Sequence, residues 1–542
     1  MFKSQGLCRH VERRPVILSA AKDLVPRTPR SFAALRMTGR IARTSAHGRS
    51  SLQMSRLCYL ARNNSSLMCR LITCSIIKQE IVLQMKRAKP LLPAIGIFCL
   101  ALLVRVIYNN TVAHNYYPLH DSLFYQTIGL NIVKEHCFCL HPYISTVYRA
   151  PLWPFIIGAI SIVFGPGDYF ARLFLCLVGS GTCALIYLFA RDLFGWRIGV
   201  LAGIMAAVYP ELYIYDGWLY TESLYIFLLF AVCYGLYRLQ RAPRGNWRIW
   251  ITCGILLGLL SLTRPNGILV IGLFIAWALI MAWQKLLLWR PTARGMLATT
   301  LIAIVLIAPW TVRNYLVSHT IIPVATGDGT VLLGAYNDEI LTTPGFKGLW
   351  IDPLKSRPDV AKPYPLFTCT PPCEVAREEA YKNAAVQWIG EHISIMPHLL
   401  KLHLLNMWQP DTHEADLPTD RFPNQKSSQI VLAMMKTFPI AIFILAALGF
   451  AVTLWRWREL LFLYFMIALT IAQGLIFYGS ARFRAPIEPI LILLAAGAIW
   501  WLTHKEEGTL RWILDRIRHE NQPPTGAPTE SEVSISSATR ID

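Results

Sequence analysis

The charged residues best suited to chemistry lie at the ends of long apolar segments. Two are acids, Asp121 and Glu222, and several arginines accompany them. These arginines are Arg264, Arg313, Arg482 and Arg484. Burying an ionisable group near a membrane is costly without a partner or a water-filled cavity, so each is a functional candidate. A guanidinium group donates two hydrogen bonds to phosphate and keeps its charge when partly desolvated. The set predicts an anion site with a carboxylate beside it.

The composition indicates the elements that must position these residues. Of 542 residues, 54% are apolar and only 15% are charged, whereas soluble proteins carry roughly 25% charged residues. The apolar residues form long blocks without period 2 or 3.6, which predicts an all-α polytopic membrane protein. Disorder, collagen, coiled coil and a small disulfide-stapled scaffold are excluded.

Ten apolar blocks are predicted to cross the membrane. They are 90–108, 170–190, 197–213, 220–237, 249–263, 267–284, 296–312, 430–454, 460–478 and 486–502. A further segment, 151–165, is short and begins with Pro151 and Pro154. If it does not cross, every short basic loop falls on one side, which the positive-inside rule makes the cytoplasm. If it crosses, a further span is needed, and the count becomes eleven to thirteen.

This topology divides the chain into regions. An N-terminal transmembrane catalytic module, 85–312, contains an outside loop at 109–150. A second outside loop, 313–429, is too long for a simple connection and is predicted to be partly folded and functional. Helices in 430–503 complete the bundle. Residues 504–542 are predicted to form a cytoplasmic amphipathic helix and a disordered tail.

The first 84 residues are strongly basic, which explains most of the formal net charge of +20. They lack the order of a signal peptide and resemble spurious translation of bacterial intergenic repeats. We therefore expect the natural start at Met85. The alternative is a disordered basic arm that binds a membrane or nucleic acid; no nucleic-acid partner is expected for the rest of the chain.

Four cysteines in the predicted outside loops form two close pairs, Cys137/Cys139 and Cys369/Cys373. An oxidising compartment permits disulfides, and a zinc site would need further His or Cys ligands at suitable spacing. A local disulfide, a zinc site and free thiols remain the alternatives.

Six motifs occur in the order seen in family 39 glycosyltransferases, which the chain resembles over about 90–502. They are HDSLFY at 120–125, YRAPL at 148–152, TESL at 221–224, LTRP at 262–265, PWTVRN at 309–314 and ARFRAP at 481–486. This family has the GT-C fold and includes protein O-mannosyltransferases and the lipid A aminoarabinose transferase. The resemblance implies a GT-C-like bundle of ten to thirteen helices with two long extracytoplasmic loops.

The resemblance also implies transfer of a sugar from a polyprenyl-phosphate donor to a glycolipid, polymer or protein acceptor. The multi-pass enzyme would lie in the bacterial plasma membrane, with its active site on the extracytoplasmic face. Asp121 corresponds to the family's first-loop acid, expected to take the acceptor's proton during inverting displacement. Arginines are expected to hold the donor phosphate; these are Arg149, Arg264, Arg313, Arg482 and Arg484.

This chain departs from the family pattern at two positions. Ser122 stands where a second acid is frequent, and Ala150 where a lysine is frequent. Arg149, one residue earlier, is expected to replace that lysine. No metal ligands are assigned, and assistance by a divalent metal is left open.

Each candidate also has a structural interpretation. Asp121 could cap a helix, and Arg264 and Arg313 could anchor the chain at the interface. Glu222 could pair with an arginine, and Tyr125 and Tyr148 could serve packing.

Two other functions compete with sugar transfer. They are a multi-span secondary transporter and a non-catalytic scaffold that uses 313–429 to bind a partner. A transporter would usually show internal repeats and polar groups near mid-membrane, and neither is evident in the sequence.

Overall fold

The computed structural model describes residues 91–115, 117–242, 246–410, 419 and 422–504. The described residues belong to one compact unit, 88–542. The predicted leader, the start at Met85 and the tail beyond residue 504 lie outside the described residues.

Each predicted span corresponds to a helix. They are α6 (Leu91–Thr111), α9 (Tyr169–Phe194), α10 (Trp196–Val208), α11 (Glu222–Gln240), α12 (Trp247–Thr263), α13 (Gly267–Trp283), α14 (Trp289–Ser318), α20 (Lys426–Thr453), α21 (Trp457–Ile476) and α23 (Glu488–Thr503). Within the described residues, 6 helical stretches are long and apolar enough to cross a membrane, and one of them contains both α20 and α21. The prediction of an all-α polytopic membrane protein is confirmed.

Shorter elements connect these helices. They are α7 (Asp121–Lys134), β1 (Cys139–His141), β2 (Ile144–Ser145), α8 (Leu152–Phe164), η1 (Pro210–Leu212), η2 (Ile214–Gly217), α15 (Asp328–Ala335), η3 (Asp338–Ile340), α16 (Pro353–Ser356), α17 (Pro358–Ala361), α18 (Pro371–Glu391), α19 (Met396–Met407), η5 (Leu454–Arg456), α22 (Ala481–Arg484) and η6 (Ala485–Ile487). Strands β1 and β2 form one antiparallel pair. Helix α8 has 13 residues, about 20 Å of helix against a hydrocarbon core of about 30 Å. That α8 does not cross the membrane stays a prediction.

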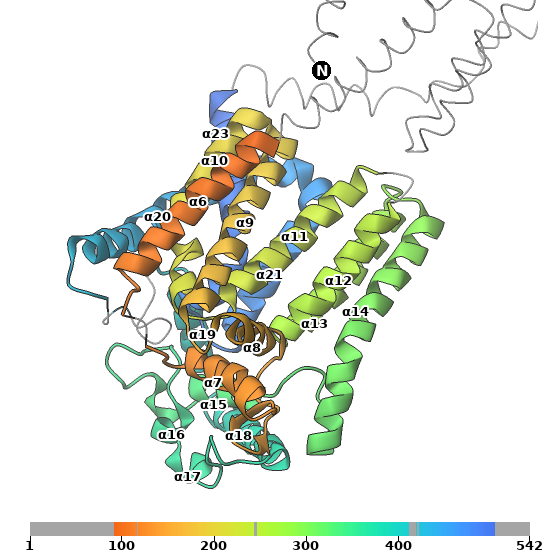
Figure 1. Ribbon diagram of the computed structural model, residues 1–542. Helices are drawn as coiled ribbons and strands as arrows, with labels where there is room; N and C mark the ends of the chain where they lie inside the picture. Colours follow the sequence, from red (N-terminus) through yellow and green to blue (C-terminus); the bar gives the residue numbers. More distant parts are fainter. Residues whose placement is uncertain (1–90, 116, 243–245, 411–418, 420–421, 505–542) are drawn as a thin grey trace, which may run out of the picture. The chain divides into compact units, whose positions relative to one another are not determined.

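The bundle is built around α23, which packs against α20, α10 and α9 (Figure 1). Residues 488–498 of α23 are all buried, which explains why this helix is apolar on every side. Helix α12 packs between α11 and α14. Because α11 and α12 are antiparallel neighbours, the start of α11 lies beside the end of α12.

The region between α14 and α20 is folded over most of its length. Helices α15, α17, α18 and α19 share a core that includes Leu333, Ala361, Trp388 and Leu399. Figure 1 shows α7, α15 and α18 at the same end of the long helices. The long second loop therefore contributes structure at the same end of the bundle as the first.

Candidate functional site

Asp121 is held between two arginines at the start of α7. Its Oδ1 lies 2.5 Å from Nη2 of Arg149 and its Oδ2 lies 2.6 Å from Nη2 of Arg482. His120, the residue before it, has a positive φ of 50°, a strained backbone conformation of the kind that clusters at functional sites. The helix N-terminus also favours a negative charge at this position. Both oxygens bind guanidinium groups, and no side-chain capping hydrogen bond is present at the start of α7, where His120 is the N-cap residue.

Arg482 extends this contact to a second carboxylate. Its Nε donates to Oε1 of Glu222, and Nη1 of Arg264 lies 3.2 Å from the same oxygen. Glu222 is the first residue of α11, and Arg264 directly follows α12. The packing of α11 against α12 therefore brings these two side chains together. We call Asp121, Arg149, Glu222, Arg264 and Arg482 the charge network.

Aromatic rings support the arginines of the charge network. The Arg149 guanidinium lies 4.2 Å from the ring centroid of Tyr148, 4.8 Å from that of Phe124 and 5.7 Å from that of Tyr125. Arg482 lies 4.4 Å from the ring of Tyr220. Such contacts attract a cation and limit its motion. Tyr125 and Tyr148 thus pack against a functional candidate, whereas the sequence offered no reason to single out Phe124 or Tyr220.

The charge network is buried at one end and open at the other. The Glu222 side chain is 0% exposed, whereas that of Asp121 is 23% exposed. Within the described residues, Nε of Arg149 and Oε2 of Glu222 are buried without a hydrogen-bond partner. Buried polar atoms are normally satisfied, so an unpaired donor and acceptor beside a partly open carboxylate are typical of a site that awaits a ligand.

Electrostatics keep Asp121 ionised. Burial alone would raise the pKa of its carboxyl group, but the positive charges of Arg149 and Arg482 outweigh that effect and hold the pKa below its usual range. The charge network contains three guanidinium groups and two carboxylates, which leaves one formal positive charge to attract an anion.

Two predicted phosphate-binding arginines lie outside the charge network. Arg484 is fully buried, where it pairs with Glu488 at 2.5 Å and donates to the carbonyl oxygens of Met407 and Gln409. Arg313 donates to the carbonyl oxygens of Thr146 and Phe138. Both guanidinium groups bind protein atoms, so these positions favour structural roles.

Sequence reasoning missed a set of buried charges between α10 and α11. Asp216 in η2 pairs at 2.9 Å with Arg105 of α6, and both side chains are 0% exposed. Ser223 also donates to Asp216. The signal was present, because Arg105 interrupts the apolar span 90–108, where an ionisable residue is unusual. This pair ties the chain just before Glu222 to α6.

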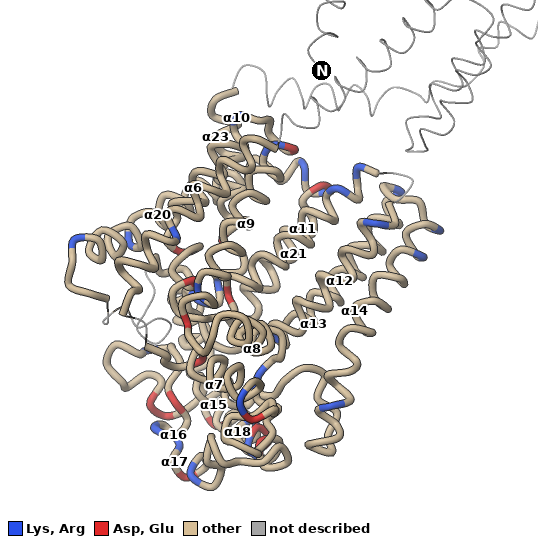
Figure 2. Tube along the Cα trace, viewed as in Figure 1, with Lys and Arg blue, Asp and Glu red and all other residues tan. Residues whose placement is uncertain are grey.

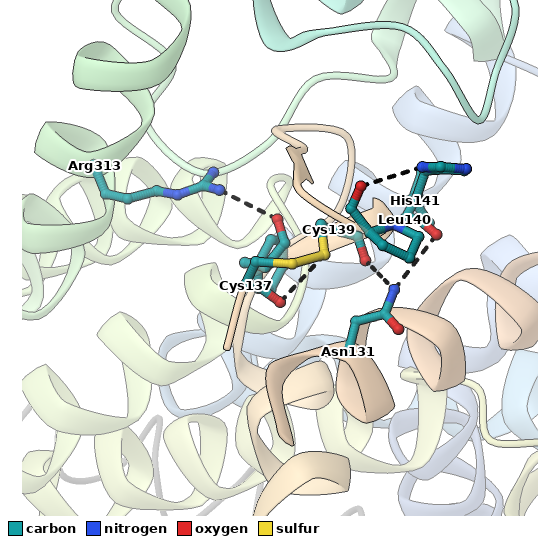
Figure 3. The surroundings of a disulfide bond; sticks show 8 residues. Asn131, Cys137, Cys139, Leu140, His141 and Arg313 are labelled. Carbon is teal, nitrogen blue, oxygen red and sulfur yellow. Dashed lines mark hydrogen bonds between the residues drawn. A yellow bond between two sulfur atoms is a disulfide. The ribbon is translucent and has the colours of Figure 1, made fainter. Parts of the chain in front are cut away.

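The cysteine pairs form disulfides, Cys137–Cys139 and Cys369–Cys373. The first lies in the turn leading to β1, beside Asn131 and Arg313 (Figure 3). Of the three alternatives for these cysteines, which were a local disulfide, a zinc site and free thiols, the structure contains the local disulfide in both pairs. Across the described ranges, there is no group of three or more His, Cys, Asp or Glu residues that could hold a metal ion.

Comparison with known families supports the resemblance seen in the motifs. Residues 148–312 match the family described as dolichyl-phosphate-mannose-protein mannosyltransferase. The matched segment contains Arg149, Glu222 and Arg264 of the charge network, and it confirms the resemblance to GT-C glycosyltransferases. No curated protein matches the chain. The comparisons give no support to the transporter alternative.

Two solved structures are similar at low sequence identity. The oligosaccharyltransferase AglB from Archaeoglobus fulgidus, in complex with an inhibitory peptide and a dolichol-phosphate, has 14% identity and a TM-score of 0.49. The match covers 82% of this chain and 53% of AglB, so the chain spans about half the length of that protein. ArnT from Cupriavidus metallidurans, bound to undecaprenyl phosphate, has 14% identity and a TM-score of 0.34, with coverage of 79% of this chain and 81% of ArnT.

Proposed function

We propose that this chain is a membrane glycosyltransferase that moves a sugar from a polyprenyl-phosphate donor to an acceptor. The observation that carries the proposal is the contact of Asp121 with both Arg149 and Arg482. Residues of five separate motifs meet in the charge network around this contact, and they supply both carboxylates and cations. The proposed catalytic module 85–312 provides four of the five residues, and Arg482 from 430–503 completes the site.

The donor phosphate is expected to bind the arginines. A phosphate leaving group requires neutralisation of its charge, which Arg149, Arg264 and Arg482 can supply. The buried Nε of Arg149 has no hydrogen-bond partner in the described part of the chain, so a phosphate oxygen can accept its hydrogen bond. Similarly, Oε2 of Glu222 can accept a hydrogen bond from a hydroxyl group of the donor sugar.

Asp121 is the proposed base in an inverting displacement. The acceptor oxygen attacks the anomeric carbon, the bond from that carbon to the phosphate oxygen breaks, and the acceptor proton passes to Asp121. Before the donor binds, two guanidinium groups hold both carboxylate oxygens. Binding of the phosphate to these groups releases Asp121 and raises its basicity, because the cations then face a second anion. The donor is therefore expected to bind before the acceptor.

The active site is proposed to face the extracytoplasmic side of a bacterial plasma membrane. Glu222 lies at the start of α11, and Arg241 follows its opposite end. Figure 2 shows Lys and Arg at the ends of α11, α12 and α14 that lie away from α15 to α18. Short basic loops favour the cytoplasm, and both disulfides lie in the predicted outside loops, where oxidation is permitted.

The pH dependence provides one test of Asp121. Because its pKa lies below the usual range, the group stays ionised on acidification, and kcat/KM is expected to lose nothing to its protonation between about pH 7 and about pH 5. Arg149→Gln removes one cation, which raises the pKa of Asp121 and moves the acid limb to higher pH. Normalised pH profiles of the two proteins measure this shift. Identical profiles with an acid limb near pH 6 would argue against Asp121 as the base.

The function itself is tested by mass spectrometry of surface glycans and lipids from cells with and without the gene. Loss of one sugar from one class of molecule, restored by the wild-type gene, is the expected result and identifies donor and acceptor together. Unchanged glycans and lipids, together with no transfer by the purified protein from polyprenyl-phosphate sugars, would refute the proposal.

A further inference from the structure

We propose that Glu374 and Arg313 are positioning residues that hold the segment 146–148 and thereby aim Arg149 at the donor phosphate. This inference rests on the proposed function, in which Arg149 contacts that phosphate. It gives the extracytoplasmic region 313–429 a defined part in donor binding.

The carboxylate of Glu374 holds a side chain and a backbone N–H of the segment 146–148. Its Oε1 accepts a hydrogen bond at 2.6 Å from the hydroxyl of Thr146, and its Oε2 accepts one at 2.7 Å from the backbone N–H of Val147. Glu374 is buried, so water does not readily replace its carboxylate as the acceptor of these two hydrogen bonds. Loss of the carboxylate would leave two buried donors unpaired, which is costly.

Arg313 holds the same segment from α14. Its Nη1 donates at 2.7 Å to the carbonyl oxygen of Thr146, and its Nη2 donates at 3.3 Å to that of Phe138. Figure 3 shows this side chain reaching the turn with the Cys137–Cys139 disulfide. Thr146 is thus fixed through its carbonyl group by α14 and through its hydroxyl group by α18.

Helix α18 is itself firmly anchored. Glu378, one turn after Glu374, accepts hydrogen bonds from the N–H and the hydroxyl of Thr330 in α15. The Cys369–Cys373 disulfide closes the chain immediately before Glu374. Gly329 is required for this contact, because a Cβ at that position would lie 2.1 Å from the carbonyl oxygen of Glu378. A rigid support of this kind can fix the position of the neighbouring backbone.

The position of Arg149 depends on this support. Two guanidinium groups contact the Tyr148 ring: the Cζ atom of Arg149 lies 4.2 Å from the ring centroid, and that of Arg377 in α18 lies 4.7 Å from it. The Nε of Arg149 has no hydrogen-bond partner among the described residues. The Arg149 fork contacts Asp121 and the ring of Tyr148. The backbone just before Arg149 and the Tyr148 ring both contact α18, so α18 helps to set where the fork lies.

The inference is tested with Glu374→Ala and Glu374→Gln. Glu374→Ala is expected to raise the KM for the donor, and the Kd for undecaprenyl phosphate used as a probe, by roughly tenfold. The kcat is expected to change much less, because Asp121 is untouched. Gln keeps one acceptor oxygen and should give an intermediate effect. Glu391→Ala, at the exposed end of α18, is the matched control and should behave as wild type.

A double-mutant cycle with Arg149→Lys separates positioning from general destabilisation. If Glu374 acts through Arg149, Glu374→Ala will weaken binding of undecaprenyl phosphate less in the Arg149→Lys protein than in the wild type. An equal loss in both backgrounds, or a loss of kcat alone, would overturn the inference. A failure of the proposed function can be told apart from a failure of this inference. If Arg149 does not contact the donor phosphate at all, Arg149→Ala will leave binding of undecaprenyl phosphate unchanged.

Discussion

Replacing Asp121 by Asn is expected to lower the rate of sugar transfer by roughly 10²–10⁴-fold, the usual contribution of a general base. Asn has nearly the same shape as Asp but cannot take the acceptor's proton. It also removes the negative charge that Arg149 and Arg482 bind. The released cations remain available to phosphate, so affinity for undecaprenyl phosphate is expected to stay constant or increase. Transfer assays and binding assays on the purified protein measure the two effects separately.

The matched control for this change is Glu135→Gln, at the opposite end of α7. It removes a carboxylate from the same helix without touching the charge network, and transfer should continue at the wild-type rate. Transfer at the wild-type rate by Asp121→Asn would show that another group accepts the proton. A loss of both transfer and undecaprenyl phosphate binding would indicate a collapsed site instead of a missing base.

The bundle and much of the charge network could be predicted because two simple signals agree. The apolar blocks define the helices, and the positions of short basic loops define the side on which each helix ends. Asp121, Glu222, Arg264 and Arg482 all fall at helix ends on the same predicted side, and in the structure they lie in one connected set of ion pairs. The sequence could thus group these residues, although it could not give their partners.

The different positions of Arg482 and Arg484 show where this reasoning stops. Both belong to one motif and to the short helix α22. Residues two apart on a helix point in nearly opposite directions, since each residue turns the chain by about 100°. Arg482 therefore reaches Asp121, whereas Arg484 turns inward to Glu488. A sequence motif by itself does not show which of its side chains face the site.

Arg313 and Glu374 show a second limit. Arg313 follows a span that is predicted to run outward, as Arg264 does, but it binds backbone carbonyl groups of a loop more than 160 residues earlier in the chain. Glu374 lies in a region with no membrane signal, and its partners Thr146 and Val147 are 228 and 227 residues earlier in the chain. Such contacts depend on the tertiary fold of the two long loops, for which apolar periodicity carries no information.

Arg482 connects Asp121 to Glu222, and its replacement is expected to be the most damaging of the arginine changes. Arg482→Ala should lower kcat/KM for transfer by roughly 10²–10³-fold, because it removes a cation from the donor phosphate. Arg482→Lys keeps the charge but not the planar fork that binds two carboxylates at once. It is expected to recover only part of the activity. Steady-state transfer assays on the two variants, with Arg458→Ala at an exposed position in the first turn of α21 as control, measure the effect.

Removal of Arg482 also deprives the fully buried Glu222 of a partner, so a loss of activity alone could reflect poor folding. The double variant Arg482→Ala/Glu222→Gln resolves this ambiguity, because it neutralises the buried acid that would otherwise lack that partner. Its thermal stability in detergent should exceed that of Arg482→Ala, while transfer remains as low. If stability and transfer recover together, Arg482 serves only to neutralise Glu222, and the proposed phosphate contact at this position is wrong.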